Sequence, residues 1–168
     1  MIPTLHTERL TLRPHARGDF DAYAAFMASE RSVYMGGPFD RDKAWAWFTT
    51  EIASWALYGF GTLAMVYDGR LAGGVGLIHP PHFPEPECGW QVFDGFEGLG
   101  LATEGARAML DHTFATTDLP SIVSYIDVDN APSIRVAEKL GGVRDPHAAK
   151  ADGDGDDTYV FRHQRRAA

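Results

Sequence analysis

The stretch FDGFEGLGLATEGARAMLDHTFA, residues 93–115, decides the fold that we expect for this chain. It begins as a loop with three glycines, Gly95, Gly98 and Gly100, and continues as a helix whose apolar residues recur on one face. The preceding run CGWQVF has the composition of a strand. Because the first amides of a helix lack intrahelical partners and lie at the positive end of its dipole, this order of elements favours phosphate binding. A tight turn without a ligand would give the same pattern.

The composition is that of one folded domain covering residues 1–168, with 45% apolar residues. A net charge of −8 argues against a nucleic-acid partner and favours a cationic substrate such as an amine. The single cysteine, Cys88, allows no intramolecular disulfide, which agrees with a reducing compartment. The chain starts without a signal-peptide pattern and contains no run of transmembrane length. We therefore expect a cytoplasmic protein with no membrane partner.

Upstream of the glycine loop, the pattern predicts a strand at 9–13 and then two helices, capped by Asp19 and Asp40. The dipeptide at 68–69, Asp-Gly, predicts a hairpin, and the proline-rich segment 79–87 predicts a surface loop. The second helix is expected to point four residues inward: Trp45, Phe48, Ile52 and Trp55.

Downstream, SIVSYIDVD predicts a strand, Asn130 can cap a short helix, and GVRD with TYVFRH predicts a closing hairpin. The order of elements is then strand, two helices, three strands, helix, strand, helix and two strands. It indicates an α+β fold: a mixed, mostly antiparallel twisted sheet of about six to seven strands flanked by four helices.

Three segments in register resemble the GNAT superfamily of acyl-CoA N-acetyltransferases, most of all the branch that acetylates the N-termini of ribosomal proteins. The first is EGLGLATEG at 97–105, which is similar to that branch's x-G-x-G-x-A-T-E pyrophosphate loop. The second is NAPSIRVAEKLG at 130–141, which resembles its N-x-x-S-x-x-x-x-E-K-L-G segment. The third is TERLTLRP at 7–14, which looks like its opening strand.

The resemblance implies acetyl-CoA as the acyl donor and no metal. It places the pyrophosphate on the loop and helix amides of Gly98, Gly100, Leu101, Ala102 and Thr103. The backbone at Val92 and Phe93 would leave its neighbouring strand, bind the pantetheine arm and polarise the thioester carbonyl, while Asn130 would touch the same arm. Relatives in the family are often dimers, so a homodimer stays open.

Three positions depart from the family pattern. Glu97 stands at the first loop position, where Gln or Arg is common, and we expect its carboxylate to point away from the pyrophosphate. Ala137 stands where many members have a proton-donating Tyr. Gly142 replaces the usual Phe after Gly141.

The chemistry needs a base, because an amine attacks a thioester only in its neutral form. The favoured base is Glu87, although a strand-end carboxylate is equally a solvated surface group. His79 and His82 are the runner-up bases, and Asp94 is closer to the cofactor loop. Ser133 matches the branch's serine near the CoA sulfur, where it would protonate or only orient the leaving thiolate.

The acceptor side is less defined by the sequence. Trp47, Tyr34 and Met35 could shape it, because the second helix borders the acceptor in this family. The acidic turn at 152–157 is expected to be solvated and not a calcium loop, since the bidentate Glu of such loops is missing. The predicted function is acetyl transfer to a primary amine, which could be a protein N-terminus or a small amine. The alternative is an acetyl-CoA-binding sensor or interaction protein without catalysis. A general nucleotide binder is disfavoured because no Walker lysine follows the glycines.

Overall fold

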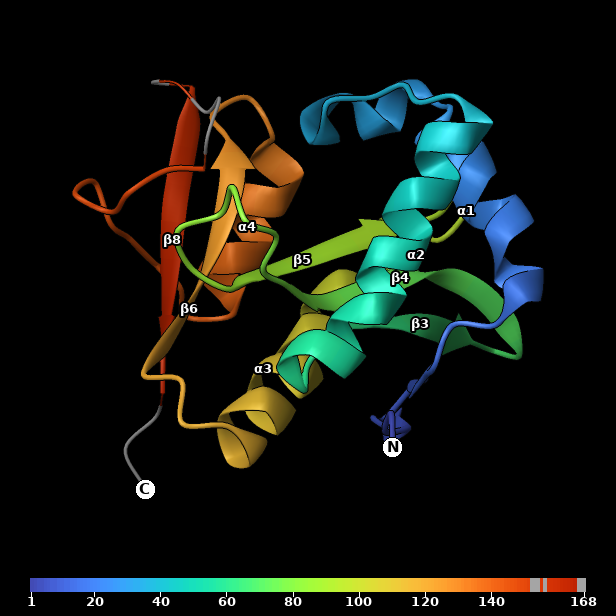
Figure 1. Ribbon diagram of the computed structural model, residues 1–168, viewed down its shortest axis with the longest axis horizontal. Coiled ribbons are helices and arrows are strands. Elements are labelled where there is room, and N and C mark those ends of the chain that lie inside the picture. The colour runs from blue at the N-terminus through green and yellow to red at the C-terminus, as the bar shows by residue number, and fades with distance from the viewer. Residues whose placement is uncertain (152–154, 156, 166–168) are drawn as a thin grey trace.

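The computed structural model describes residues 1–151, 155 and 157–165. Its centre is a single sheet of eight strands in the order β1-β2-β3-β4-β5-β6-β8-β7 (Figure 1). The strands are β1 (Leu5–His6), β2 (Leu10–Arg13), β3 (Thr62–Tyr67), β4 (Arg70–Ile78), β5 (Glu87–Val92), β6 (Ser121–Asp127), β7 (Val143–Arg144) and β8 (Thr158–Gln164). The helices are α1 (Phe20–Met27), α2 (Arg41–Tyr58), α3 (Leu101–Thr116) and α4 (Ala131–Lys139), with the 3-10 turns η1 (Arg17–Asp19) and η2 (Glu30–Met35).

The predicted fold class is confirmed, with one more strand than expected. All strand pairs are antiparallel except the β5–β6 pair. The additional strand is β1, whose two residues pair with β2 and are too few to show an alternating pattern. The hairpin at Asp68-Gly69, the cap of α2 by Asp40 and the cap of α4 by Asn130 all form as predicted. The predicted cap of α1 by Asp19 does not form, because the Asp19 carboxylate accepts from Arg13 and Ala16 N–H instead.

The two faces of the sheet carry different helices. On β5, the side chain of Gln91 bonds to Glu51 of α2, whereas that of its neighbour Trp90 bonds to Ser133 of α4. Because neighbouring side chains of a strand point to opposite faces, α2 covers one face and α4 covers the other. Helix α3 lies with α4: its Gly105 approaches Val75, which stands opposite Trp90 in the sheet. The pocket described below is lined by residues from both faces of the sheet, among them Glu51 of α2 and Ser133 of α4.

The expectation for the inward face of α2 is wrong in part. Phe48 is buried as predicted, while Trp45 is 43% exposed and lies edge-on against Phe20 at 4.7 Å between ring centroids. Ile52 and Trp55 are partly buried against the core. The fully inward stripe is Ala44, Phe48, Glu51 and Ser54, rotated by one residue from the predicted one. The prediction followed the spacing of the large aromatic residues, whereas the face that the helix buries carries smaller and more polar side chains.

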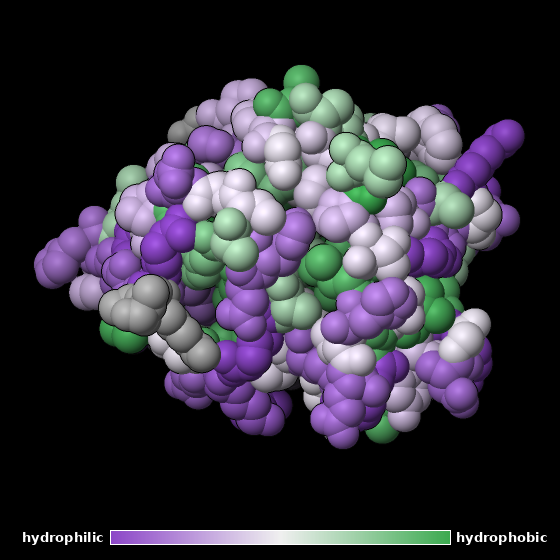
Figure 2. Space-filling view, turned by 90° about the horizontal axis from the view of Figure 1, so that it is seen from below, coloured by the Kyte–Doolittle hydropathy of each residue, from purple (hydrophilic) through white to green (hydrophobic). Residues whose placement is uncertain are grey.

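One face of the molecule is mainly polar. In the view of Figure 2, hydrophilic side chains predominate and hydrophobic ones form small, separated patches. Among the described residues, no helix has the length and apolar content that crossing a membrane would require.

Candidate functional site

Strand β5 separates from β6 immediately after its first residue. The only paired position between the two parallel strands is Glu87 with Val123. On its other side, β5 stays paired with β4 along its whole length. Alternate residues of an antiparallel strand direct their backbone groups to the same neighbour. Phe93 N–H donates to Ala72 O of β4, so Phe93 N–H and the backbone groups of Gln91 point toward β4. The residues between and before them, Val92 and Trp90, therefore direct their backbone groups to the open edge.

The structure contradicts part of the expectation for this strand. The backbone of Phe93 was expected to be free for a ligand, but its N–H bonds to Ala72 O at 2.8 Å and its carbonyl accepts from Phe96 N–H at 3.2 Å. Its ring is buried against Phe26. The tight turn into the glycine loop uses the groups of Phe93, so Val92 is the residue left to meet a ligand at this edge.

The glycine loop leads directly into an uncapped helix. The first hydrogen bond of α3 joins Glu104 N to Gly100 O at 3.1 Å, so the amides of Leu101, Ala102 and Thr103 precede the intrahelical series. Gly100 is the N-cap residue, with φ of 79°, and contributes no side-chain cap. Glycine is favoured here because this backbone conformation is left-handed, a region that residues with a side chain rarely adopt. Free donors at the positive end of a 16-residue helix are suited to holding an anion.

A clasp fixes the back of this loop and joins two of the sequence motifs. The carboxylate of Glu104, from the A-T-E motif, accepts from Thr7 Oγ1 at 2.6 Å, Arg9 N at 2.8 Å and Arg9 Nε at 2.7 Å. Arg9 Nη1 also donates to Leu99 O at 2.9 Å. Burial alone would raise the pKa of Glu104, but the hydrogen bonds from Thr7 and Arg9 hold it below its usual range. The T-E-R-L segment thus sets the position of the loop from behind.

Glu97 takes part in a separate cluster at the entrance of the loop. Its carboxylate accepts from Gly95 N–H at 2.8 Å and pairs with Arg31 of η2 at 2.7 Å. Arg31 also forms an ion pair with the exposed carboxylate of Asp94 at 2.7 Å. This contact gives Asp94 a structural role and not that of the base. These contacts draw the charge of Glu97 toward η2 and partly neutralise it, which reduces the repulsion expected against a phosphate.

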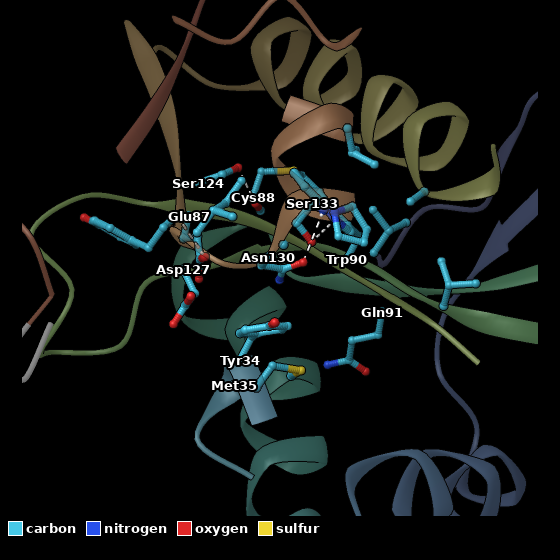
Figure 3. A pocket seen from close by; sticks show the side chains of 18 of the residues that line it. Tyr34, Met35, Glu87, Cys88, Trp90, Gln91, Ser124, Asp127, Asn130 and Ser133 are labelled. Carbon is cyan, nitrogen blue, oxygen red and sulfur yellow. Dashed lines mark hydrogen bonds between the residues drawn. The ribbon is translucent and has the colours of Figure 1, made fainter. Parts of the chain in front are cut away.

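Ser133 lies at the N-terminus of α4 and faces β5. Its hydroxyl accepts a hydrogen bond from Trp90 Nε1 at 3.2 Å, while its backbone N–H donates to Asn130 Oδ1 at 3.3 Å (Figure 3). The indole N–H occupies a lone pair of Ser133 Oγ, so the hydroxyl proton is available to a further acceptor. Ala137, at the position of the family's Tyr, is fully buried.

One large pocket connects these features. Its volume is about 1080 Å³, and it runs from the glycine loop along β5 to η2 and α2. It brings together most of the predicted residues: Glu87, Val92, Gly98, Gly100, Leu101, Ala102, Thr103, Asn130 and Ser133, with Trp47, Tyr34, Met35 and His82. Phe93, His79 and Asp94 do not line it.

The residues that the sequence suggested as the general base differ in whether they line the pocket. Glu87 begins β5, lines the pocket, and its carboxylate accepts from Tyr125 N–H at 3.3 Å. His82 lines the pocket beside Phe83, whereas His79 packs near Tyr58. Glu87 is therefore better placed than His79, and His82 stays a candidate by position.

Sequence reasoning missed several residues of the pocket, and three of them enter the argument below: Trp90, Glu51 and Gln91. Trp90 is the hydrogen-bond donor to Ser133. Glu51 is a carboxyl that is only 5% exposed and lies at the base of the pocket. Burial raises the pKa of Glu51 to about 7, although Tyr23, Thr62 and Gln91 all donate to it. A charged residue in the inward stripe of α2 was the available signal, and the wrong rotation of that stripe concealed it.

Other buried polar groups stabilise the strands around the pocket. Cys88 is fully buried, and burial raises the pKa of its thiol, as expected for a structural residue. Ser124 Oγ donates to Cys88 O at 2.7 Å and lies 3.1 Å from His163 Nε2. Because the hydroxyl proton is used at Cys88 O, His163 must donate to Ser124, so this pair does not form an activated nucleophile.

The acidic turn lies mostly outside the described residues, namely at 152–154 and 156. Among the residues that the structure does describe, no cluster of three His, Cys, Asp or Glu side chains could hold a metal ion.

Comparison with known proteins agrees with this geometry. Residues 9–143 match the family model described as the acetyltransferase (GNAT) domain. This chain belongs to the GNAT acetyltransferase family. A solved acetyltransferase from Agrobacterium tumefaciens is 44% identical, with a TM-score of 0.93 over 98% of this chain and 96% of that one.

More distant relatives carry more specific names. The FsC-acetyl coenzyme A-N(2)-transacetylase of Aspergillus fumigatus is 31% identical over 157 residues, which are 83% of this chain and 64% of the fungal protein. This GNAT chain therefore spans less than two thirds of the fungal protein. RimL, an α-N-acetyltransferase of ribosomal L7/L12 solved with coenzyme A, has a TM-score of 0.77 at 16% identity over 96% of this chain and 98% of its own, which shows a shared fold.

Proposed function

We propose that this protein transfers an acetyl group from acetyl-CoA to a primary amine by direct attack within a ternary complex. The observation that carries the proposal is the open edge of β5, which leads into the uncapped N-terminus of α3. A thioester with a diphosphate tail matches this arrangement, because the tail meets the amides of Gly98 to Thr103 and the arm meets Val92.

The leaving sulfur would lie near Ser133. Its hydroxyl accepts from Trp90 Nε1 and keeps its proton, so it can donate to the thiolate as the C–S bond breaks. Asn130, which caps α4 through Ser133 N–H, holds this hydroxyl in place and borders the arm of the donor. Ser133 is thus proposed to stabilise and orient the leaving group.

The base is proposed to be a carboxylate on the face of β5 that α2 covers. Glu87 is the candidate that the sequence selects, since it lines the pocket at the start of β5. Glu51 is a second carboxyl on this face, and its role is argued separately below. In both cases the carboxylate takes a proton from the ammonium form of the acceptor before attack.

The acceptor itself is proposed to be a small amine or a protein N-terminus, both of which are cationic at neutral pH. The net charge of −8 favours the approach of a cation. Among the proteins compared above, RimL is named as an α-N-acetyltransferase of ribosomal L7/L12, which is a protein substrate. By composition, we propose a cytoplasmic protein.

Thiol release from acetyl-CoA, followed with a panel of amines, tests this proposal. We expect release above the hydrolysis background with at least one amine, and mass spectrometry should find the acetylated amine. Binding of CoA without release with any amine or peptide N-terminus would favour the non-catalytic sensor. Equal thermal stabilisation by ATP and CoA would contradict the donor assignment.

A further inference from the structure

The strongest unexplained feature is the buried polar group around Glu51. Its carboxylate accepts from Tyr23 Oη at 2.8 Å, from Gln91 Nε2 at 3.2 Å and from Thr62 Oγ1 at 3.2 Å. Among the described residues, no Lys, Arg or His forms an ion pair with it. A buried carboxylate without a cation is costly to ionise, so its retention at the base of a pocket points to a ligand that supplies the charge.

Gln91 supplies the second, independent observation. Its side chain is buried, with the residue 8% exposed, and its amide nitrogen is used on Glu51. Its Oε1 has no hydrogen-bond partner. A buried amide oxygen without a donor is rare in native proteins, and here the residue lines the pocket. This oxygen and the Glu51 carboxylate together form an acceptor-only surface that suits a group carrying several N–H donors.

The position of this pair on β5 connects it with the transfer reaction. Glu87, Gly89 and Gln91 alternate along one face of the strand, and Trp90 with Ser133 lies on the other. Figure 3 shows Gln91 on the side of Met35 and Tyr34, opposite Ser133. A Cβ placed on Gly89 would meet no atom within 4 Å, so the strand leaves open space beside Gln91. This space adjoins the open edge where the thioester is proposed to lie.

We propose that Glu51 and Gln91 form the subsite for the ammonium group of the acceptor, and that Glu51 takes its first proton. The inference rests on the proposed function and assigns its acceptor class: a primary amine with two or three N–H donors. One N–H of the ammonium donates to Gln91 Oε1 and another to the carboxylate of Glu51.

Both protons that the ammonium group loses during acetyl transfer have an acceptor. Glu51 receives one proton and becomes neutral, and the freed lone pair of the amine forms the C–N bond to the thioester carbon. When the C–S bond breaks, the thiolate takes the second proton from the nitrogen, with Ser133 oriented toward the sulfur. Glu51 then releases its proton to solvent. A carboxyl whose pKa lies at about 7 can both accept and release a proton under these conditions.

The experiment compares Glu51→Gln, Gln91→Met and Glu87→Gln with the wild type. The probes are n-butylamine and glycinamide, with tetramethylammonium as a cation that lacks N–H donors. Thermal shifts of the CoA complex measure amine binding at pH 8, and thiol release measures kcat/KM between pH 5.5 and 9. Shifts with CoA alone test the donor site separately, because neither Glu51 nor Gln91 is proposed to touch the CoA.

We expect the two primary amines, and not tetramethylammonium, to stabilise the wild-type complex. Glu51→Gln should abolish this shift, lower kcat/KM by about 100-fold or more, and remove the decrease of rate below about pH 7. Gln91→Met should raise KM more than it lowers kcat. All variants should bind CoA with wild-type affinity within about threefold, which also shows that they are folded.

Three outcomes would overturn the inference. The first is an absence of any shift by both primary amines in the wild type. The second is amine binding and a pH profile that stay unchanged in Glu51→Gln. The third is loss of the acidic limb in Glu87→Gln alone, which would make Glu87 the base. In the last two cases the proposed acetyl transfer survives; it fails instead if CoA does not bind or no amine is acetylated.

Discussion

The clasp around Glu104 allows a quantitative test of how the cofactor loop is held. In Glu104→Gln, three hydrogen bonds from Thr7 Oγ1, Arg9 N and Arg9 Nε lose their ionised acceptor, and the new amide N–H₂ group faces Arg9. Hydrogen bonds to charged groups contribute about 1.5–3 kcal/mol, against about 0.5–1.5 kcal/mol for neutral ones. Because the Arg9 side chain is 39% exposed and water can replace part of the loss, we take the lower end, about 2 kcal/mol in total.

Two measurements check this value. For a chain of this length, about 2 kcal/mol corresponds to a Tm lower by about 4–8 °C. The loop also loses part of its preorganisation, because Arg9 no longer holds Leu99 O in place. Calorimetric titration should therefore give a CoA affinity about tenfold weaker, which equals about 1.4 kcal/mol.

The matched control is Glu8→Gln, which changes the net charge equally at an exposed residue of the same motif. Its free energy of unfolding should stay within about 0.5 kcal/mol of the wild type. The folded-state pKa of Glu104 is lowered, so its contribution is present above the unfolded pKa and is lost as the pH falls through the folded one. The two variants should therefore converge in strongly acidic solution. If Glu104→Gln matches Glu8→Gln in Tm and in CoA affinity at pH 7, the clasp does not position the loop.

Three further predictions concern the loop, acid stability and the sheet. Gly100→Glu should fold, with a loss of about 1–2 kcal/mol from its left-handed backbone, and should lose CoA binding in a titration; wild-type affinity would refute the loop assignment. Burial lowers the pKa of both His15 and His163 to about 4, so the unfolded state binds more protons than the folded state between pH 6.5 and 4. The free energy of unfolding, measured in urea melts, should therefore fall by about 3 kcal/mol for each histidine as the pH decreases through that interval. This loss of stability should be steeper in Glu51→Gln. The Glu51 carboxyl of the wild type has a raised pKa, so its protonation in the folded state adds stability as the pH falls and offsets part of the loss. A free energy of unfolding that does not change with pH would contradict the burial of the histidines. Gly76→Ala should destabilise by about 1–3 kcal/mol in the same melts, because its Cβ would lie 2.3 Å from the carbonyl oxygen of the residue before β3; a stable variant would mean that the strands can separate there.

The local backbone geometry of the proposed donor site could be predicted from the sequence because its signals are local. The glycine loop, the uncapped start of α3 and the Asn130 cap all lie within short segments whose spacing determines their conformation. The proposed binding uses main-chain amides, so it depends on backbone shape and not on distant side chains. The single error there, Phe93, arose because its partners Ala72 and Phe96 are set by strand register and turn geometry, which composition does not reveal.

The proposed acceptor subsite could not be predicted, because its residues and their partners come from four separate elements. Tyr23 lies on α1, Glu51 on α2, Thr62 on β3 and Gln91 on β5, and no motif joins them. A rotation of α2 by one residue decides whether Glu51 points to solvent or into the pocket, and the aromatic pattern indicated the wrong rotation. The same reasoning explains the clasp: Thr7 and Glu104 were each seen in a motif, but their contact spans 97 positions.

The separation between a donor site made of backbone groups and an acceptor site made of side chains bears on how substrate specificity can change in this fold. In the proposed arrangement, the loop and the β5 edge meet the donor through backbone groups, which tolerate many side chains, whereas the acceptor meets the side chains of Glu51 and Gln91. Substitutions on α2 and β5 can therefore alter the acceptor while the donor site keeps its geometry. It follows that Gly89→Val, which fills the open space beside Gln91 without a left-handed backbone, should block the amine while sparing CoA. Parallel titrations with CoA and n-butylamine would decide this, and a proportional loss of both ligands would show that the two halves are not separable.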